Sequence, residues 1–191
     1  YFGGTFFDAA NLVTVDAGLV YVLGAATTGF PTTAGAYDTS YAGSSDIYVS
    51  VWDLAGNGAS DLIYSSYFGL AGDDVVRTVD VDAGIIYFAG YTGSSYPTTA
   101  GAFDVTKVGF GNEGALTVFN PAGGGASDLL YSTLFGGTDQ ETINAISYDD
   151  SDGTIVGCIA ARSGDIPTTS GAYDSAGDGF GDTYIFRLNP A

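Results

Sequence analysis

The sequence predicts an all-β protein of three β-propeller-type repeats, each a four-stranded antiparallel blade, with the last blade incomplete. Three observations lead to this fold class: a segment that recurs at nearly constant spacing, strand-like apolar runs, and a composition rich in turn residues. The chain of 191 residues contains 30 Gly, and its acids are 20 Asp against two Glu. Aspartate and glycine favour turns whereas glutamate favours helices, so short strands joined by tight turns are expected. A β-solenoid or a stacked β-sandwich array has similar strand content and is the alternative.

Three copies of a Pro-Thr-Thr segment define the repeats. They occupy 31–38, 97–104 and 167–174, and they begin 66 and 70 residues apart. A second marker agrees, because the tripeptides that start at Tyr1, Tyr67 and Leu134 and continue with Phe-Gly are 66 and 67 residues apart. We therefore place the repeats at 1–66, 67–133 and 134–191.

Each repeat is expected to contribute its strands in the same order. The first strand alternates apolar and polar residues, as in Val13, Thr14 and Val15, and an Asp-Ala-Gly hairpin turn follows it at 16–18. The second strand is continuously apolar, and the Pro-Thr-Thr segment after it forms a long loop because proline does not fit a central strand. The predicted second strands are 19–25, 85–91 and 155–161, the third strands are 46–53, 113–120 and 182–189, and the fourth strands are 61–68 and 128–135.

The charge of the chain excludes several classes of function. The formal net charge is −18, with four Lys and Arg residues and no His. So few cations cannot neutralise a phosphate backbone or an anionic lipid surface, so neither nucleic acid nor a membrane is an expected partner. Without His, the usual general base near neutral pH and the Ser-His-Asp triad are missing, so no enzyme is expected. No apolar run reaches 18 residues, so membrane insertion is not expected either.

The third repeat lacks a fourth strand. The Ala-Ser-Asp-Leu segment that opens this strand occurs at 59–62 and 126–129, but no copy follows Asn189 or precedes Tyr1. Open sheet edges accept strands from other chains, and head-to-tail addition that does not close produces a filament. The alternative is that the chain is a fragment of a longer propeller. The residues expected at a subunit interface are Tyr1, Phe2, Phe6, Phe7, Leu188 and Pro190.

Two acidic loops are candidate calcium sites. Asp149, Asp150 and Asp152 lie in the turn that replaces Asp-Ala-Gly in the third repeat, and Asp178 and Asp182 bound a glycine-rich loop. Ca²⁺ accepts carboxylate and carbonyl oxygens, although neither loop has the EF-hand pattern, and a solvated turn is the alternative. No other cofactor is expected.

Other acids recur once in every repeat. Asp46, Glu113 and Asp182 open the third strands, so they are expected to cap loop N–H groups rather than to act in catalysis. Cys158 is expected to be a small buried side chain on the second strand, aligned with Val22 and Phe88.

Two features of the sequence indicate contacts with sugars. The loop threonines are candidates for O-linked glycosylation; they are Thr32, Thr33, Thr98, Thr99, Thr168 and Thr169. An exposed subset of the 14 Tyr and 12 Phe residues could also stack on sugars, which favours glycan binding as the alternative function.

The markers together resemble the bacterial β-propeller repeat family usually called SBBP. The resemblance rests on the Tyr-Ser-Ser-Tyr-Phe-Gly run at 64–69, the related run at 131–137, the three Pro-Thr-Thr segments, and the Asn-Pro-Ala segments at 120–122 and 189–191. It covers essentially the whole chain. It implies a secreted or cell-surface propeller without a defined activity, and it brings no catalytic residues.

We therefore expect an extracellular structural protein that assembles with copies of itself into a filament, sheath or surface layer through strand complementation. A glycan- or ligand-binding propeller module of a larger secreted protein is the alternative.

Overall fold

The computed structural model describes residues 1–177 and 181–190, and the strands in this part of the chain form three antiparallel sheets. The first sheet comprises β1 (Ala9–Asp16), β2 (Leu19–Ala26), β3 (Asp46–Trp52) and β4 (Leu62–Phe68). The second comprises β5 (Asp74–Asp82), β6 (Ile85–Thr92), β7 (Glu113–Phe119) and β8 (Leu129–Phe135). The third comprises β9 (Glu141–Asp149), β10 (Thr154–Ala161) and β11 (Asp182–Leu188). The all-β class and the order of the strands are thus confirmed.

Sequence neighbours pair within each sheet, in the orders β1-β2-β3-β4, β5-β6-β7-β8 and β9-β10-β11. The predicted fourth strands began one residue early, because Asp61 and Asp128 end the short 3-10 turns η1 (Gly58–Asp61) and η2 (Gly125–Asp128). No helix long and apolar enough to cross a membrane occurs among the described residues.

The hairpin turns follow the prediction from the Asp-Ala-Gly segments. Ala17 and Gly18 both have positive φ angles, 47° and 85°, and Ala83 and Gly84 repeat this with 48° and 81°. Two consecutive positive φ angles are typical of a type I′ turn, whose twist matches that of the paired strands.

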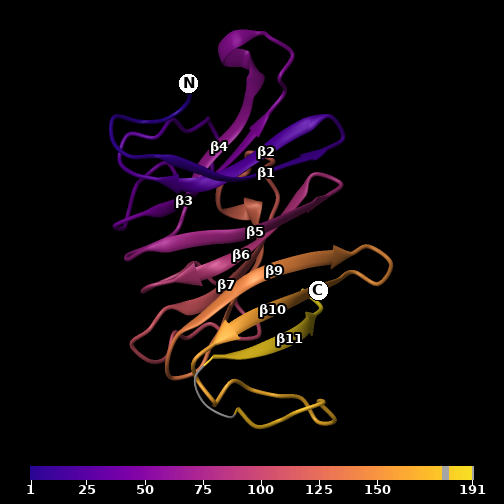
Figure 1. The fold of residues 1–191 in the computed structure, drawn as a ribbon. Coiled ribbons are helices and arrows are strands. Elements are labelled where there is room, and N and C mark those ends of the chain that lie inside the picture. Colours follow the sequence, from indigo (N-terminus) through magenta and orange to yellow (C-terminus); the bar gives the residue numbers. More distant parts are fainter. Residues whose placement is uncertain (178–180, 191) are drawn as a thin grey trace.

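The sheets are stacked face to face in sequence order, with the first at the top of the view and the third at the bottom (Figure 1). One apolar core lies between the first and second sheets and includes Leu23, Phe68 and Phe88. A second core lies between the second and third sheets and includes Leu116, Ile143 and Ile159. Within the described residues the stack stays open and forms no closed barrel or propeller.

Strand register makes the sheets comparable residue by residue. Asp46 pairs with Ala26, Glu113 with Thr92, and Asp182 with Ala161, so these three acids hold equivalent positions.

The Pro-Thr-Thr loop is fastened to the fourth strand of its own sheet. Thr33 N donates to Ser65 O at 3.0 Å, and Ser65 N donates to the Thr33 hydroxyl at 3.0 Å. Thr99 and Ser132 repeat both contacts in the second sheet, at 3.0 and 3.1 Å. The loop therefore depends on the fourth strand for its hydrogen bonds.

The third Pro-Thr-Thr loop has no such strand in the described part of the chain. Its Tyr173 is fully exposed, whereas the equivalent Tyr37 stacks on Phe68 and the equivalent Phe103 stacks on Phe135. The third loop therefore lacks the ring contact that Tyr37 and Phe103 make with a fourth strand, although Phe103 is itself 55% exposed.

Candidate functional site

The outer face of the first sheet is apolar and uncovered. Val13 and Val15 are 68% and 65% exposed. The equivalent Val79 and Val81 of the second sheet pack against the core shared with the first sheet. The alternation predicted for the first strand is present in β1, but its half-buried face is the one with Leu12, Thr14 and Asp16. Val13 and Val15 lie on the exposed face, because no sheet in the described part of the chain covers it.

Phe2 covers part of this outer face. Its ring lies edge-on to Phe30 and Trp52, with centroids 4.7 Å away in both cases. Phe68 makes the equivalent contacts one sheet further on, with Tyr96 and Phe119. Phe2 therefore contacts the first sheet in the way that Phe68, the last residue of β4, contacts the second sheet.

The other predicted interface residues have separate environments. Tyr1, Phe6 and Phe7 are exposed. The rings of Phe6 and Phe7 therefore do not cover the apolar face of their own sheet. Leu188 packs against the core between the second and third sheets, and Pro190 is half-buried. The predicted interface residues are therefore not all on free surfaces. Those near the N-terminus lie at the first-sheet end of the stack, whereas Leu188 lies against the core between the second and third sheets.

Ile185 is an exposed large apolar residue on the outer face of the third sheet, between the exposed Thr183 and Arg187, and the sequence did not single it out. Ile185 is 80% exposed, whereas the equivalent Leu116 and Val49 are fully buried under the next sheet of the stack. The sequence carries no signal for this contrast, because all three equivalent residues are apolar.

Cys158 lies on the same outer face. It pairs with Ala145 and Ile185, and its equivalents are therefore Ala89 and Leu23 rather than the expected Phe88 and Val22. The alignment was one residue off because β10 begins at Thr154. Cys158 is consequently half-exposed, which corrects the expectation of burial.

Paired acids occupy the junctions between successive sheets. Asp46 opens β3 and Asp74 opens β5, and their charges act on each other; Glu113 and Glu141 repeat the arrangement at the next junction. All four side chains are at most 1% exposed. Asp8 and Asp182 hold the corresponding positions at the two ends of the stack.

These acids cap loop N–H groups, as the sequence predicted for Asp46 and Glu113. Ala42 N donates to Asp46 at 2.8 Å, and Val108 N donates to Glu113 at 3.0 Å. Burial raises the pKa of Asp46, and it raises the pKa of Asp74 and of Glu113 to about 7 in each case. Hydrogen bonds from the loop N–H groups oppose these shifts but do not cancel them.

The predicted calcium turn of the third repeat contains an ion pair. Arg187 contacts Asp152 at 2.7 Å and Asp149 at 3.4 Å, and Asp149 also accepts a hydrogen bond from Ser151 N. Hydrogen bonding to Ser151 and the Arg187 charge lower the pKa of Asp149. Asp150 is exposed in this turn, and Asp178 lies outside the described residues. In the described ranges no group of three or more His, Cys, Asp or Glu side chains is arranged to hold a metal, and calcium at these loops stays a prediction.

The candidate glycosylation sites differ in accessibility. Thr168 and Thr169 are exposed, and Thr32 and Thr98 are half-buried. The hydroxyls of Thr33 and Thr99 accept hydrogen bonds from the fourth strands. Glycosylation of the six threonines stays a prediction.

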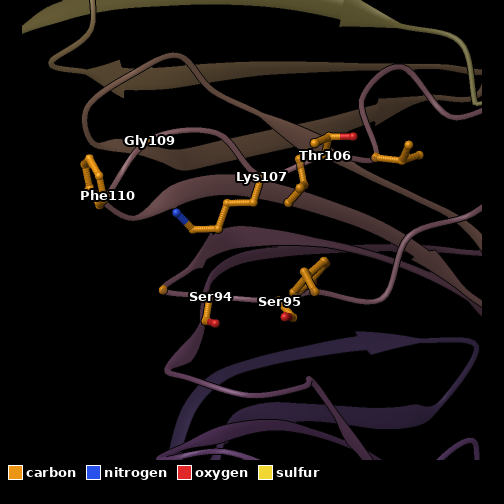
Figure 2. A pocket seen from close by; sticks show the side chains of 10 residues that line it. Ser94, Ser95, Thr106, Lys107, Gly109 and Phe110 are labelled. Atoms are coloured by element: carbon orange, nitrogen blue, oxygen red, sulfur yellow. The ribbon is translucent and has the colours of Figure 1, made fainter.

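A shallow pocket of about 560 Å³ opens beside the second sheet. The Lys107 side chain runs across it towards Phe110, and Ser94 and Ser95 lie opposite (Figure 2). Lys107 Nζ donates to Gly111 O at 2.7 Å, and the Phe110 ring is fully exposed. An exposed ring beside hydroxyl groups can stack on a sugar and hydrogen-bond to it.

No protein-family model matches this chain, and no curated protein is significantly similar to it.

Proposed function

We propose that this chain is an extracellular structural repeat protein that assembles head to tail with copies of itself into a filament, sheath or surface layer. The outer face of the third sheet of one copy packs on the outer face of the first sheet of the next. The observation that carries the proposal is the exposure of Val13 and Val15 at one end of the stack and of Ile185 at the other, where the equivalent residues inside the stack are packed.

The stacking within the chain supports this choice of partner. The second sheet packs on the first through Val79 and Val81, and the equivalent Val13 and Val15 are exposed. The side of the second sheet that contains Leu116 faces the third sheet, and the equivalent Ile185 is exposed. The two end faces are therefore equivalent to two faces that already fit each other inside the chain, and their burial is favourable in proportion to the apolar area covered.

Strand complementation would extend the same contact. β11 lies at the edge of the third sheet, and the third Pro-Thr-Thr loop exposes Tyr173. A strand from the next copy that paired with β11 would supply the hydrogen bonds and the aromatic contact that Ser65 and Phe68 supply in the first repeat. Tyr1 and Phe2 are equivalent to the residues that end such a strand.

The identification of the three sheets as propeller-type blades is part of the same proposal. We regard each sheet as a β-propeller-type blade, because four antiparallel strands per repeat and face-to-face stacking are typical of blades. The SBBP resemblance supports an extracellular location and a structural role, and no nucleic acid or membrane partner is required.

A single substitution tests the stacking. Ile185→Asp places a charge on the outer face of the third sheet, where it would have to be buried without a partner. We expect fibres of the unmodified chain in negative-stain electron microscopy and a 19.4 kDa monomer for Ile185→Asp by light scattering. Leu54→Asp is the control, since Leu54 is also exposed (67%) but lies in the loop after β3. An unmodified chain that remains monomeric at its highest soluble concentration would contradict the proposal.

Glycan binding remains the second candidate because of the pocket beside Lys107 and Phe110. Glycan-array binding by the monomeric Ile185→Asp variant, lost on Phe110→Ala, is the result that this candidate requires. Binding that survives Phe110→Ala, or no binding at all, excludes this pocket as a sugar site.

A further inference from the structure

We propose that the junction between the first and second sheets is a Ca²⁺ site, formed by the carboxylates of Asp46 and Asp74 with main-chain oxygens of the connecting loop. The site lies within one chain, so it does not depend on assembly. It is separate from the acidic turn of the third repeat, where Arg187 already neutralises part of the charge.

Each of the two carboxylates has one oxygen that is used and one that is free. Ala42 N donates to Oδ2 of Asp46 at 2.8 Å, and Leu70 N donates to Oδ2 of Asp74 at 2.9 Å. Oδ1 of each residue is buried and has no hydrogen-bond partner among the described residues. A buried, ionised oxygen without a partner is costly, so two of them at one junction indicate an additional positive partner.

Thr92 and Gly43 interact with these carboxylates and lower their pKa, but neither gives the two oxygens a hydrogen bond of normal geometry. The Thr92 hydroxyl lies near Asp74, but it donates to Ser95 O at 3.3 Å. The Gly43 N–H lies near Asp46 without forming a hydrogen bond of normal geometry to its free oxygen.

The oxygens converge around two glycines. A Cβ atom on Gly43 would lie 2.9 Å from Asp46 Oδ1, 2.7 Å from Leu70 O, and closer still to Gly72 O. A Cβ atom on Gly69 would lie 3.3 Å from the same Asp46 oxygen and would collide with the carboxylate of Asp74. The two carboxylates and the two carbonyl oxygens thus lie close to the backbones of Gly43 and Gly69, and Gly72 O also accepts a hydrogen bond from Ser44 N at 2.9 Å.

Among residues 1–177 and 181–190, no Lys or Arg side chain forms an ion pair with Asp46 or Asp74. At the next junction Lys107 lies beside Glu113 and lowers its pKa, which opposes the effect of burial. Tyr41 holds the equivalent position beside Asp46, three residues after Asp38 as Lys107 is three residues after Asp104. The first junction therefore contains an equivalent pair of acids without a neighbouring lysine, whereas Glu113 has Lys107 beside it and one oxygen, Oε1, without a hydrogen-bond partner.

The oxygen set fits Ca²⁺ better than Mg²⁺. Ca²⁺ accepts six to eight oxygens in flexible geometry and readily binds backbone carbonyls, with water completing the shell. Mg²⁺ requires near-octahedral geometry and keeps much of its water. A bound Ca²⁺ would join the start of β3 to the start of β5 and so lock the first sheet onto the second.

Calorimetric titration of the chelator-treated full chain with CaCl₂ tests the site, at about pH 8 where carboxylates are ionised. We expect one Ca²⁺ per chain, a higher melting temperature with Ca²⁺, and weaker binding of Mg²⁺. Asp46→Asn and Asp74→Asn should each weaken binding at least about tenfold, because each removes a ligand charge. Combined Asp149→Asn and Asp152→Asn is the control and should leave binding unchanged.

A second variant keeps the test decisive if the asparagine variants do not fold. Tyr41→Lys places an ammonium group beside Asp46, as Lys107 does beside Glu113. We expect it to fold, to lose Ca²⁺ binding, and to melt at a temperature that no longer depends on Ca²⁺. The proposal is overturned if the unmodified chain shows neither heat nor a shift in melting temperature, which would leave a shared proton or a water at the junction. It is also overturned if binding is lost in the Asp149/Asp152 control instead.

Discussion

Phe2, Phe68 and Phe135 occupy equivalent positions and show how much a residue's role depends on its place in the stack. Phe68 is fully buried between the first and second sheets, where it contacts Phe88 and Phe119. Phe135 does the same between the second and third sheets, where it stacks on Phe186. Phe2 makes the corresponding contacts on the outer face of the first sheet, with Phe30 and Trp52. It is covered on one side only, because the structure describes no sheet beyond this face.

At the same scale, Glu113 makes stability depend on pH. Burial raises its pKa from 4.5 to about 7, with opposing effects from Lys107 and the Val108 N–H and reinforcing effects from Asp104 and Glu141. The folded state therefore binds a proton more tightly than the unfolded state does. This stabilisation is fully present below pH 4.5 and is lost as the pH rises through about 7, and it amounts to at most about 3 kcal/mol.

Urea unfolding between about pH 4.5 and pH 8 measures this contribution. We expect the stability of the unmodified chain to fall relative to Glu113→Gln as the pH rises. Asp150→Asn removes the same charge from an exposed turn and should keep the pH dependence. Parallel pH profiles for the unmodified chain and Glu113→Gln would show that Glu113 does not titrate in this range.

At the scale of elements, the hairpins and loops follow local rules. The predicted second and third strands lie within one residue of the observed bounds, because alternation, apolar runs and turn residues act locally. The loop contacts of Thr33 and Thr99 with the fourth strands were not predicted. These contacts join residues more than 30 positions apart. The sequence indicates them only in that the Pro-Thr-Thr segment and the fourth strand occur together in the first two repeats.

The β1–β2 hairpin contains an alanine where a type I′ turn favours asparagine. Ala17 is exposed with φ of 47°, a conformation that costs an L-residue other than glycine or asparagine about 1–2 kcal/mol. Ala17→Asn should therefore raise the free energy of unfolding by about 1 kcal/mol. Ala100→Asn, at an exposed position without a positive φ, is the control, and equal effects of the two changes on thermal unfolding would refute the turn argument.

At the scale of the whole molecule, a stack of three sheets with Val13 and Ile185 exposed at its two ends carries a formal net charge of −18. Like charge on every copy opposes association, whereas burial of the two apolar faces favours it. Which effect is larger depends on ionic strength, because the screening length falls from about 10 Å at 0.1 M salt to about 3 Å at 1 M.

Assembly should therefore increase with NaCl. Light scattering at increasing NaCl concentration should report longer assemblies of the unmodified chain and no change for Ile185→Asp, which controls for non-specific salting out. Assemblies that shorten as salt is added would mean that ion pairs, and not apolar faces, hold the copies together.

Repeat spacing, strand order, hairpin turns and the short third sheet could all be read from the amino-acid order, because each depends on residues that are close together in the chain or on the recurrence of a segment. Three other features required the fold. The exposure of Val13 and Ile185, the outward position of Cys158 and the pairing of Asp46 with Asp74 depend on which sheet faces which. Burial and charge pairing are properties of packed surfaces, and identical strand patterns in successive repeats carry no sign of which copy lies at the end of the stack.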